Sequence, residues 1–231
     1  MNYSAEMMGM GYLLPQPVLQ GYYMNGGYGR LICDKPAEEM TRAGFSIEDL
    51  DPALVDSIQA RFEELEIVKR MNEALKWRRA FGGSLIVLGL KDGGRLDQPL
   101  DEESITEIEF LRVYDCFEAT VKDRYDDPND PKFGDVEFWQ VAPKQGGSSY
   151  IVHESRCLVF DGESIPNDMR LQNNGWGASV IQTCVKQLND LSNSHKWATL
   201  LLERMQQAVY GIKGLAQLVA DKEGQTKLRH V

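Results

Sequence analysis

The 231-residue chain has few cysteines and few histidines, and both shortages argue against a metal centre. Its four cysteines are Cys33, Cys116, Cys157 and Cys184. Because no two of them form a CxxC pair, neither a zinc site nor a thioredoxin-type centre is indicated. The three histidines have no HExxH arrangement, so we expect no metal ligand among them. The cysteines are expected to be buried single thiols in a reducing compartment.

Long hydrophobic runs are also absent. The longest apolar run, residues 85–90, is far shorter than the roughly 20 residues that cross a bilayer. The first residues, MNYSAEMMGMGY, lack the basic region of a signal peptide. The sequence therefore predicts a soluble, cytoplasmic protein without a membrane partner.

Positive charge is scarce relative to negative charge. The chain has 25 Lys and Arg residues against 35 Asp and Glu residues, which gives a net charge of −10. Non-specific DNA binding depends on cations that neutralise phosphates, so a globally acidic chain argues against it. An acidic surface would instead let DNA slide past without sticking, because like charges repel.

Catalytic motifs are missing as well. Gly82-Gly83 closes a helix and enters a strand, which is the opposite polarity to a phosphate-binding loop. No G-x-S-x-G elbow occurs, and no pair of carboxylates is distinguished from a scattered acidic surface. We therefore expect no enzyme activity, no catalytic residues, no cofactor and no metal.

One partial motif keeps an alternative open. His153-Glu154-Ser155 has the H-x-S form that two-histidine phosphodiesterases use twice, with paired imidazoles as general base and acid. A second copy is required, but Lys196-Trp197 follows His195 and only Val231 follows His230. A cyclic-nucleotide phosphodiesterase or binder, acting against host immune signalling, is therefore the alternative function.

Composition divides the chain into three parts. Residues 1–30 are rich in Met, Tyr, Gly and Asn without a helical or strand period, which predicts a flexible or partner-dependent arm. Residues 31–220 form the folded domain. Residues 221–231 are polar and unpatterned, so we expect a tail at a truncation point.

Amphipathic helices make up much of the predicted domain. Pro36 suits the first turn of a short helix that Gly44 ends. A longer apolar stripe follows the Asp51-Pro52 cap to about Ala80, with a break near Glu66. Another stripe, from about residue 175 to 219, has a weak point at 192–194 where the helix is expected to bend or divide.

Short strands separate these helices. The strand SLIVLGL after Gly83 is expected to be buried on both faces. Other strands are predicted within 110–113, 119–121, 138–141, 150–152 and 157–160. The fold class is α+β, with long amphipathic helices packed on a small mixed or antiparallel sheet.

Six segments in order resemble a family of tailed-bacteriophage portal proteins found in many prophages. They are LICDKPAEEMTRAG, ALKWRRAFGGSLIVLGLKDGG, QPLD, DPNDPKFGDVEFWQV, VHESRCLVFDGESIP and NNGWGASVIQTCVKQL, which together extend over about residues 28–220. The resemblance implies the N-terminal wing region of a ring-forming subunit, usually twelve around a DNA channel at one capsid vertex. The segments for the rest of the stem, clip and crown are absent, which suggests a fragment or a truncated prophage gene.

The same resemblance implies partners and a location. A portal subunit contacts its own copies, terminase, capsid and head–tail adaptor proteins, and DNA passes through without sequence specificity. It is made in the host cytoplasm and ends in the virion. Some members of the family are labelled as related to anti-CBASS phage proteins that degrade cyclic-nucleotide immune signals. Because the second H-x-S is absent, that label is not carried over to this chain.

Five residues in these segments are candidates for contact with another subunit or with the DNA backbone: Trp77, Arg78, Arg79, Arg156 and Trp176. Arg78 and Arg79 belong to the only basic cluster. Favourable placement of cations at the negative end of a helix also explains that cluster fully. A general DNA-binding module that uses Arg78 and Arg79 is the third hypothesis.

Overall fold

The computed structural model describes residues 12–25, 27–45, 47, 51–144 and 146–205. The chain divides into two compact units, residues 1–189 and 190–231. The helices are α2 (Gln16–Asn25), α3 (Tyr28–Thr41), α4 (Pro52–Glu64), α5 (Ile67–Phe81), α6 (Asn167–Gln172) and α7 (Val180–Met205). The strands are β1 (Gly83–Lys91), β2 (Glu107–Asp115), β3 (Ala119–Arg124), β4 (Val136–Val141), β5 (Tyr150–His153) and β6 (Cys157–Asp161). Two 3₁₀ turns are η1 (Glu102–Ser104) and η2 (Glu154–Arg156).

Helix α5 has a left-handed residue at each end. Glu66 has φ +52° between α4 and α5, and Gly82 has φ +94° after the last turn. Gly82 N–H donates to the carbonyl of Arg78, which closes the helix before β1 begins. The predicted break near Glu66 and the Gly-Gly stop are therefore confirmed.

The strands form two antiparallel three-stranded sheets. One has the order β2-β1-β6 and the other β3-β4-β5. The α+β class is confirmed, but the single small sheet expected from the sequence is corrected to two sheets. The chain passes from the first sheet to the second after β2 and returns through η2 before β6.

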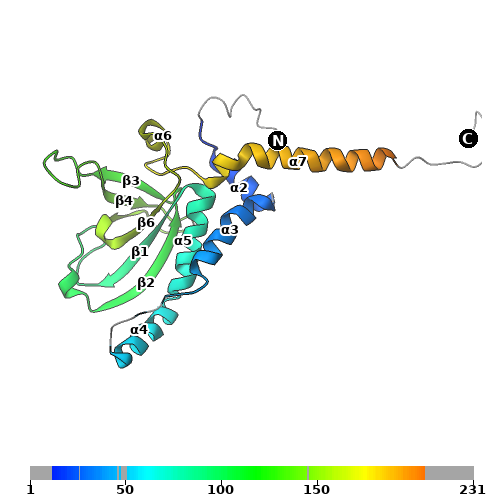
Figure 1. Cartoon of the computed structure of the whole chain (residues 1–231). Coiled ribbons are helices and arrows are strands. Elements are labelled where there is room, and N and C mark those ends of the chain that lie inside the picture. The colour runs from blue at the N-terminus through cyan, green and yellow to red at the C-terminus, as the bar shows by residue number, and fades with distance from the viewer. Residues whose placement is uncertain (1–11, 26, 46, 48–50, 145, 206–231) are drawn as a thin grey trace, which may run out of the picture. The chain divides into compact units, whose positions relative to one another are not determined.

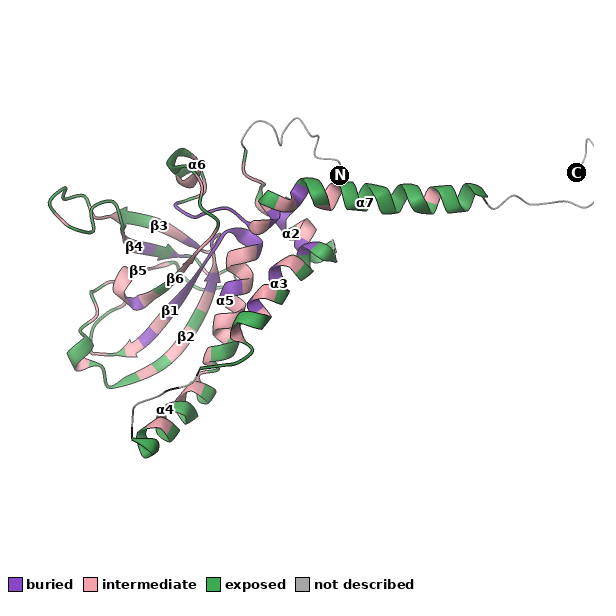
Figure 2. Cartoon of the chain, in the orientation of Figure 1, coloured by how far each residue is buried: buried purple, intermediate pink, exposed green. Residues whose placement is uncertain are grey.

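Strand β1 is buried on both faces because different layers cover it. On one face, Ser84 Oγ donates to the Ala74 carbonyl of α5 at 2.6 Å, and α3 lies along the other side of α5 (Figure 1). On the opposite face, Leu85 and Val87 join one hydrophobic cluster with Trp139 of the second sheet. Burial is concentrated along β1 and at its junction with α5 (Figure 2).

Trp176 closes the end of this core. It is 1% exposed, its Nε1 donates to the Ala119 carbonyl at 2.6 Å, and its ring lies 4.6 Å from that of Trp139. A Cβ at Gly83 would lie only 2.2 Å from the Trp176 ring. The second glycine of the Gly-Gly pair therefore makes room for this tryptophan.

The N-terminal arm differs from the prediction where the structure describes it. Residues 1–11 lie outside the described part, but residues 16–25 form α2 rather than an irregular arm. Leu19 and Tyr23, one turn apart, are buried, and Tyr23 stacks edge-on against Trp77 at 5.7 Å. Tertiary burial has overridden a glycine-rich, weakly helical sequence.

Pro36 also lies elsewhere than predicted. It occupies the interior of α3, which begins at Tyr28, instead of starting a new helix. Proline has no N–H, so the Ile32 carbonyl loses its usual helical partner. Arg79 supplies the missing donors, because its Nε and Nη2 donate to the Ile32 oxygen at 3.3 and 3.0 Å. The helix tolerates the proline because α5 supplies the missing donor.

We expect Arg79→Met to lower the free energy of unfolding by about 1–3 kcal/mol, because the Ile32 carbonyl loses its donors. The matched double variant Pro36→Ala/Arg79→Met should recover most of that loss, since an alanine in place of the proline restores a backbone N–H. Urea denaturation of the wild type, Pro36→Ala, Arg79→Met and the double variant measures the four free energies of unfolding. Equal losses in Arg79→Met and in the double variant would show that the unpaired Ile32 carbonyl does not cause the loss.

Helix α7 is continuous across the predicted weak point. Residues 192–194 are helical, and Ser194 Oγ bonds back to the Asp190 carbonyl within the helix. The expected division there is corrected, and the predicted continuation over 206–219 lies outside the described residues. Of the free cysteines, Cys33 and Cys116 are buried as predicted, whereas Cys157 and Cys184 are only partly buried.

Candidate functional site

The three contact candidates on α5 have partners within the subunit. Trp77 is half-buried and stacks on Phe81 with 5.4 Å between ring centroids. Arg78 Nε donates to the carbonyl of Asp161, and Arg79 supports Ile32 as described. A contact with DNA or another subunit stays a prediction for the parts of these side chains that face solvent.

The other two candidates, Arg156 and Trp176, are each 1% exposed. Neither presents a surface to DNA or to another subunit in this structure. Arg156 Nη1 bonds Asp92 Oδ1 at 3.1 Å, Nη2 pairs with Oδ2, and Nε donates to the Gln98 carbonyl at 2.7 Å. Both residues therefore hold the fold together.

His153 and Ser155, the residues of the partial phosphodiesterase motif, bind the long β1–β2 loop. The backbone N–H of His153 donates to the Leu96 carbonyl at 2.8 Å, and Leu100 N–H donates to Ser155 Oγ at 2.9 Å. With Arg156 and Asp92 they attach residues 92–100 to the β5–β6 turn, and we call this set of contacts the loop clamp. The described geometry gives the motif a structural role.

The His153 imidazole is buried and caps the 3₁₀ turn. Its Nδ1 accepts from Ser155 N–H at 3.2 Å and lies 2.8 Å from Ser155 Oγ. Burial lowers the pKa of His153 below its ordinary value of 6.5, although neighbouring Glu154 opposes this. The ring is therefore held neutral, since protonation of Nδ1 would break the cap.

This arrangement makes stability depend on pH. Above pH 6.5, the ordinary histidine value, the contribution of His153 is complete; below it, the unfolded chain takes up the proton first and stability falls. Between about pH 7.5 and 5.5 the wild type should lose more stability than His153→Asn, which keeps a capping oxygen but does not titrate. Urea midpoints at both pH values measure this, and parallel losses would contradict it.

No group of three or more acidic, cysteine or histidine side chains suited to a metal occurs among the described residues. His195 is exposed on α7, and His230 lies outside the described part. No described helix is long and apolar enough to cross a membrane.

The second half of α7 carries an apolar stripe that no described residue covers, and no sequence motif indicated it. Its members, between 38% and 77% exposed, are Leu191, Trp197, Leu201, Leu202 and Met205. Trp197, Leu201 and Met205 follow at intervals of four, so they lie on one side of the helix. Contiguous exposed apolar surface of this kind makes the stripe a candidate contact surface. We call these five residues the assembly face.

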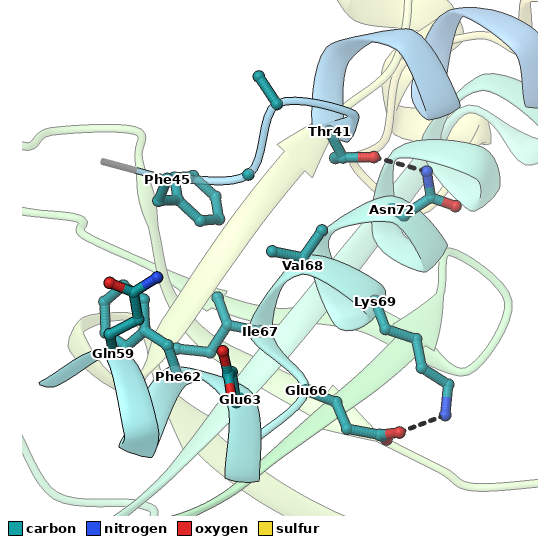
Figure 3. Close-up of a pocket in the computed structure, with 12 residues that line it drawn as sticks. Thr41, Phe45, Gln59, Phe62, Glu63, Glu66, Ile67, Val68, Lys69 and Asn72 are labelled. Atoms are coloured by element: carbon teal, nitrogen blue, oxygen red, sulfur yellow. Dashed lines mark hydrogen bonds and ion pairs between the residues drawn. The ribbon is translucent and has the colours of Figure 1, made fainter. Parts of the chain in front are cut away.

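A groove lies between the end of α3, α4 and the start of α5. It encloses about 580 Å³, and Phe45, Phe62, Ile67 and Val68 supply its apolar walls (Figure 3). Phe45 and Phe62 meet edge to face at 6.4 Å, and Phe45 is 49% exposed. Helix α4 has no buried residue at all, so its apolar side is incompletely covered by the described chain.

A family-wide sequence model described as phage portal protein matches residues 18–231, which is more than half of the chain. The chain belongs to the phage portal protein family. The matched region begins at the third residue of α2 and includes every later described helix and strand, so it contains both the loop clamp and the assembly face.

Two relatives of this portal-family chain are proteins named anti-CBASS protein Acb1. The one from Sphingomonas paeninsulae is 25% identical over 220 residues, which cover 94% of this chain and 35% of that protein. The one from Caulobacter sp. (strain RHG1) is 26% identical over 181 residues, covering 74% and 29% respectively. The portal-family chain thus spans about a third of the length of these relatives.

Proposed function

We propose that the chain is a structural subunit, or the wing part of one, of the phage portal ring through which DNA is packaged and ejected at the capsid vertex. The observation that carries the proposal is the family match over residues 18–231. The assembly face supports it, because five exposed apolar side chains on one helix are unusual in a protein that acts alone.

The negative net charge of the chain suits a DNA channel. A net charge of −10 disfavours binding to phosphate groups, so DNA moving through the channel would not be retained by the protein. A usual count of twelve subunits, and contacts with terminase, capsid and head–tail adaptor proteins, belong to the same proposal. So does a location in the host cytoplasm during assembly and afterwards in the virion.

Light scattering and negative-stain microscopy of the purified chain test the proposal. We expect closed, ring-shaped oligomers whose mass is a fixed multiple of the 26.1 kDa subunit. A strictly monomeric protein over a wide range of concentration would count against a ring subunit.

A second candidate is a cyclic-nucleotide phosphodiesterase or binder, because both relatives carry the name anti-CBASS protein. About two thirds of each relative lies outside the aligned part, so the named activity need not belong to the shared region. In this chain the His153 imidazole accepts a hydrogen bond from Ser155 N–H at the start of η2, and the His153 backbone N–H donates to Leu96 in the loop clamp. That geometry favours the structural role.

Incubation with cyclic dinucleotides decides between the two. The wild type is compared with His153→Ala and with His153→Asn, which keeps the cap. We expect no turnover by any form. Turnover by the wild type that both variants abolish, while His153→Asn keeps its fold by circular dichroism, would establish the enzyme hypothesis instead.

A further inference from the structure

The chain presents two exposed apolar features, one on α7 and one in the groove between α3, α4 and α5. The assembly face is convex and ends in large side chains, with Trp197 62% and Met205 77% exposed. The groove between α3, α4 and α5 is concave and walled by Phe45, Phe62 and Val68. The two features belong to different compact units, 190–231 and 1–189.

We propose that the assembly face of one copy docks in the groove of a second copy. This inference rests on the proposed ring function and specifies its contact. A ring needs a head-to-tail interface, in which two different surfaces of the same chain meet, because a self-complementary surface closes into a dimer. A helix stripe and a groove on one chain supply the two different surfaces.

Shape supports Trp197 as the anchor. A groove of about 580 Å³ accommodates an indole ring together with a neighbouring aliphatic side chain such as Leu201, one turn further along α7. Phe45 and Phe62 present ring edges and faces to such a guest, which suits aromatic pairing. Tryptophan is also enriched among the residues that dominate interface energies.

Charge supports a second copy as the occupant. Residues 51–64, the α4 cap and helix, contain four acidic residues, Asp51, Asp56, Glu63 and Glu64, against Arg61. On the groove wall Glu66 is paired with Lys69 and Arg70, whereas Glu63 forms no ion pair with any residue that the structure describes.

The assembly face brings the opposite charge. Residues 196–205 contain Lys196 and Arg204 against Glu203. Arg204 follows Trp197 by seven residues, so both lie on the same side of α7. Within the described ranges Arg204 also forms no ion pair. Docking of Trp197 against the two phenylalanines would allow Arg204 to pair with Glu63 at the rim.

Mixing two defective variants tests the contact. Trp197→Asp removes the anchor, and Phe62→Asp removes the groove wall. Each alone should weaken self-association on the order of 100-fold. A mixture of the two should form a one-to-one heterodimer and stop there, because each variant retains one intact half of the interface. Leu171→Asp, at a 71% exposed leucine on α6, is the matched control and should assemble like the wild type.

A charge-exchange experiment tests the same contact without Phe62→Asp, which could unfold α4. Glu63→Arg and Arg204→Glu should each weaken assembly severalfold, and the double variant should restore it. Analytical ultracentrifugation reports all of these forms, with circular dichroism as the check on folding.

The remaining outcomes overturn the proposal. Loss of assembly in Trp197→Asp with wild-type behaviour in Phe62→Asp and Glu63→Arg would mean that α7 pairs with another α7. Rings that survive Trp197→Asp would exclude this contact and leave the ring function intact. A wild type that never self-associates would exclude this contact and would also count against the proposed ring subunit.

Discussion

Arg156→Met should lower the melting temperature of the protein by about 10 °C, because it strands a buried carboxylate. The side chains of Arg156 and Asp92 are both 1% exposed, and the guanidinium also binds the carbonyls of Gln98 and Pro99. Without the guanidinium, Asp92 keeps its burial but loses its partner. Differential scanning calorimetry of wild type and variant measures the loss.

Two comparisons separate the ion pair from simple loss of packing. The double variant Asp92→Leu/Arg156→Met should be more stable than Arg156→Met, since no unpaired charge remains. Arg156 also holds the pKa of Asp92 at about 2, below its ordinary value of 3.8. The stability from this lowered pKa is complete above pH 3.8 and is lost as the pH falls toward 2, so the difference between wild type and Arg156→Met should narrow there. A difference that is constant with pH would contradict the assignment.

Trp176→Ala should lower the free energy of unfolding by about 3–5 kcal/mol, the range for deletion of a buried aromatic side chain. The ring is 1% exposed, packs on Trp139 and donates to the Ala119 carbonyl. Urea denaturation followed by far-ultraviolet circular dichroism measures the change without relying on tryptophan fluorescence.

Trp197→Ala is the matched control, because Trp197 is 62% exposed. At concentrations where the chain is monomeric, it should change unfolding by no more than about 0.5 kcal/mol. Gly83 provides a second check: Gly83→Ala should be strongly destabilising alone but much better tolerated beside Trp176→Ala, since the clashing ring is gone. Simple addition of the two losses would contradict this account.

Local signals predicted most of the elements. The cap at Asp51, the break near Glu66 and the Gly82-Gly83 stop depend on a few neighbouring residues, and the structure places each as expected. The pairing of strands into two sheets was not predictable in this way, because it joins segments far apart in the chain. Pro36 was misplaced for a similar reason, since the donor that makes its helix tolerable is on Arg79 of α5.

The site was harder to predict than the fold. Arginine and tryptophan are common at interfaces and also occur in well-packed interiors, so residue type alone does not distinguish a buried Arg156 or Trp176 from a contact residue. The 3.6-residue period predicts the helix that contains Leu201 and Met205. The same period occurs whether the apolar face packs against its own chain or against a partner, so it does not distinguish the two. The groove is formed by three segments and has no motif.

The loop clamp has a consequence for how the protein opens. Residues 92–100 belong to the connection between β1 and β2 of one sheet, yet they are bonded to the turn between β5 and β6 that leaves the other sheet. The hydrogen bond from His153 N–H, at the end of β5, to the Leu96 carbonyl joins this connection to the second sheet, and the Asp92–Arg156 pair fixes the same connection at the start of β6. Amide protons of β1 and β4 should therefore exchange with solvent through the same opening event, as one cooperative folding unit.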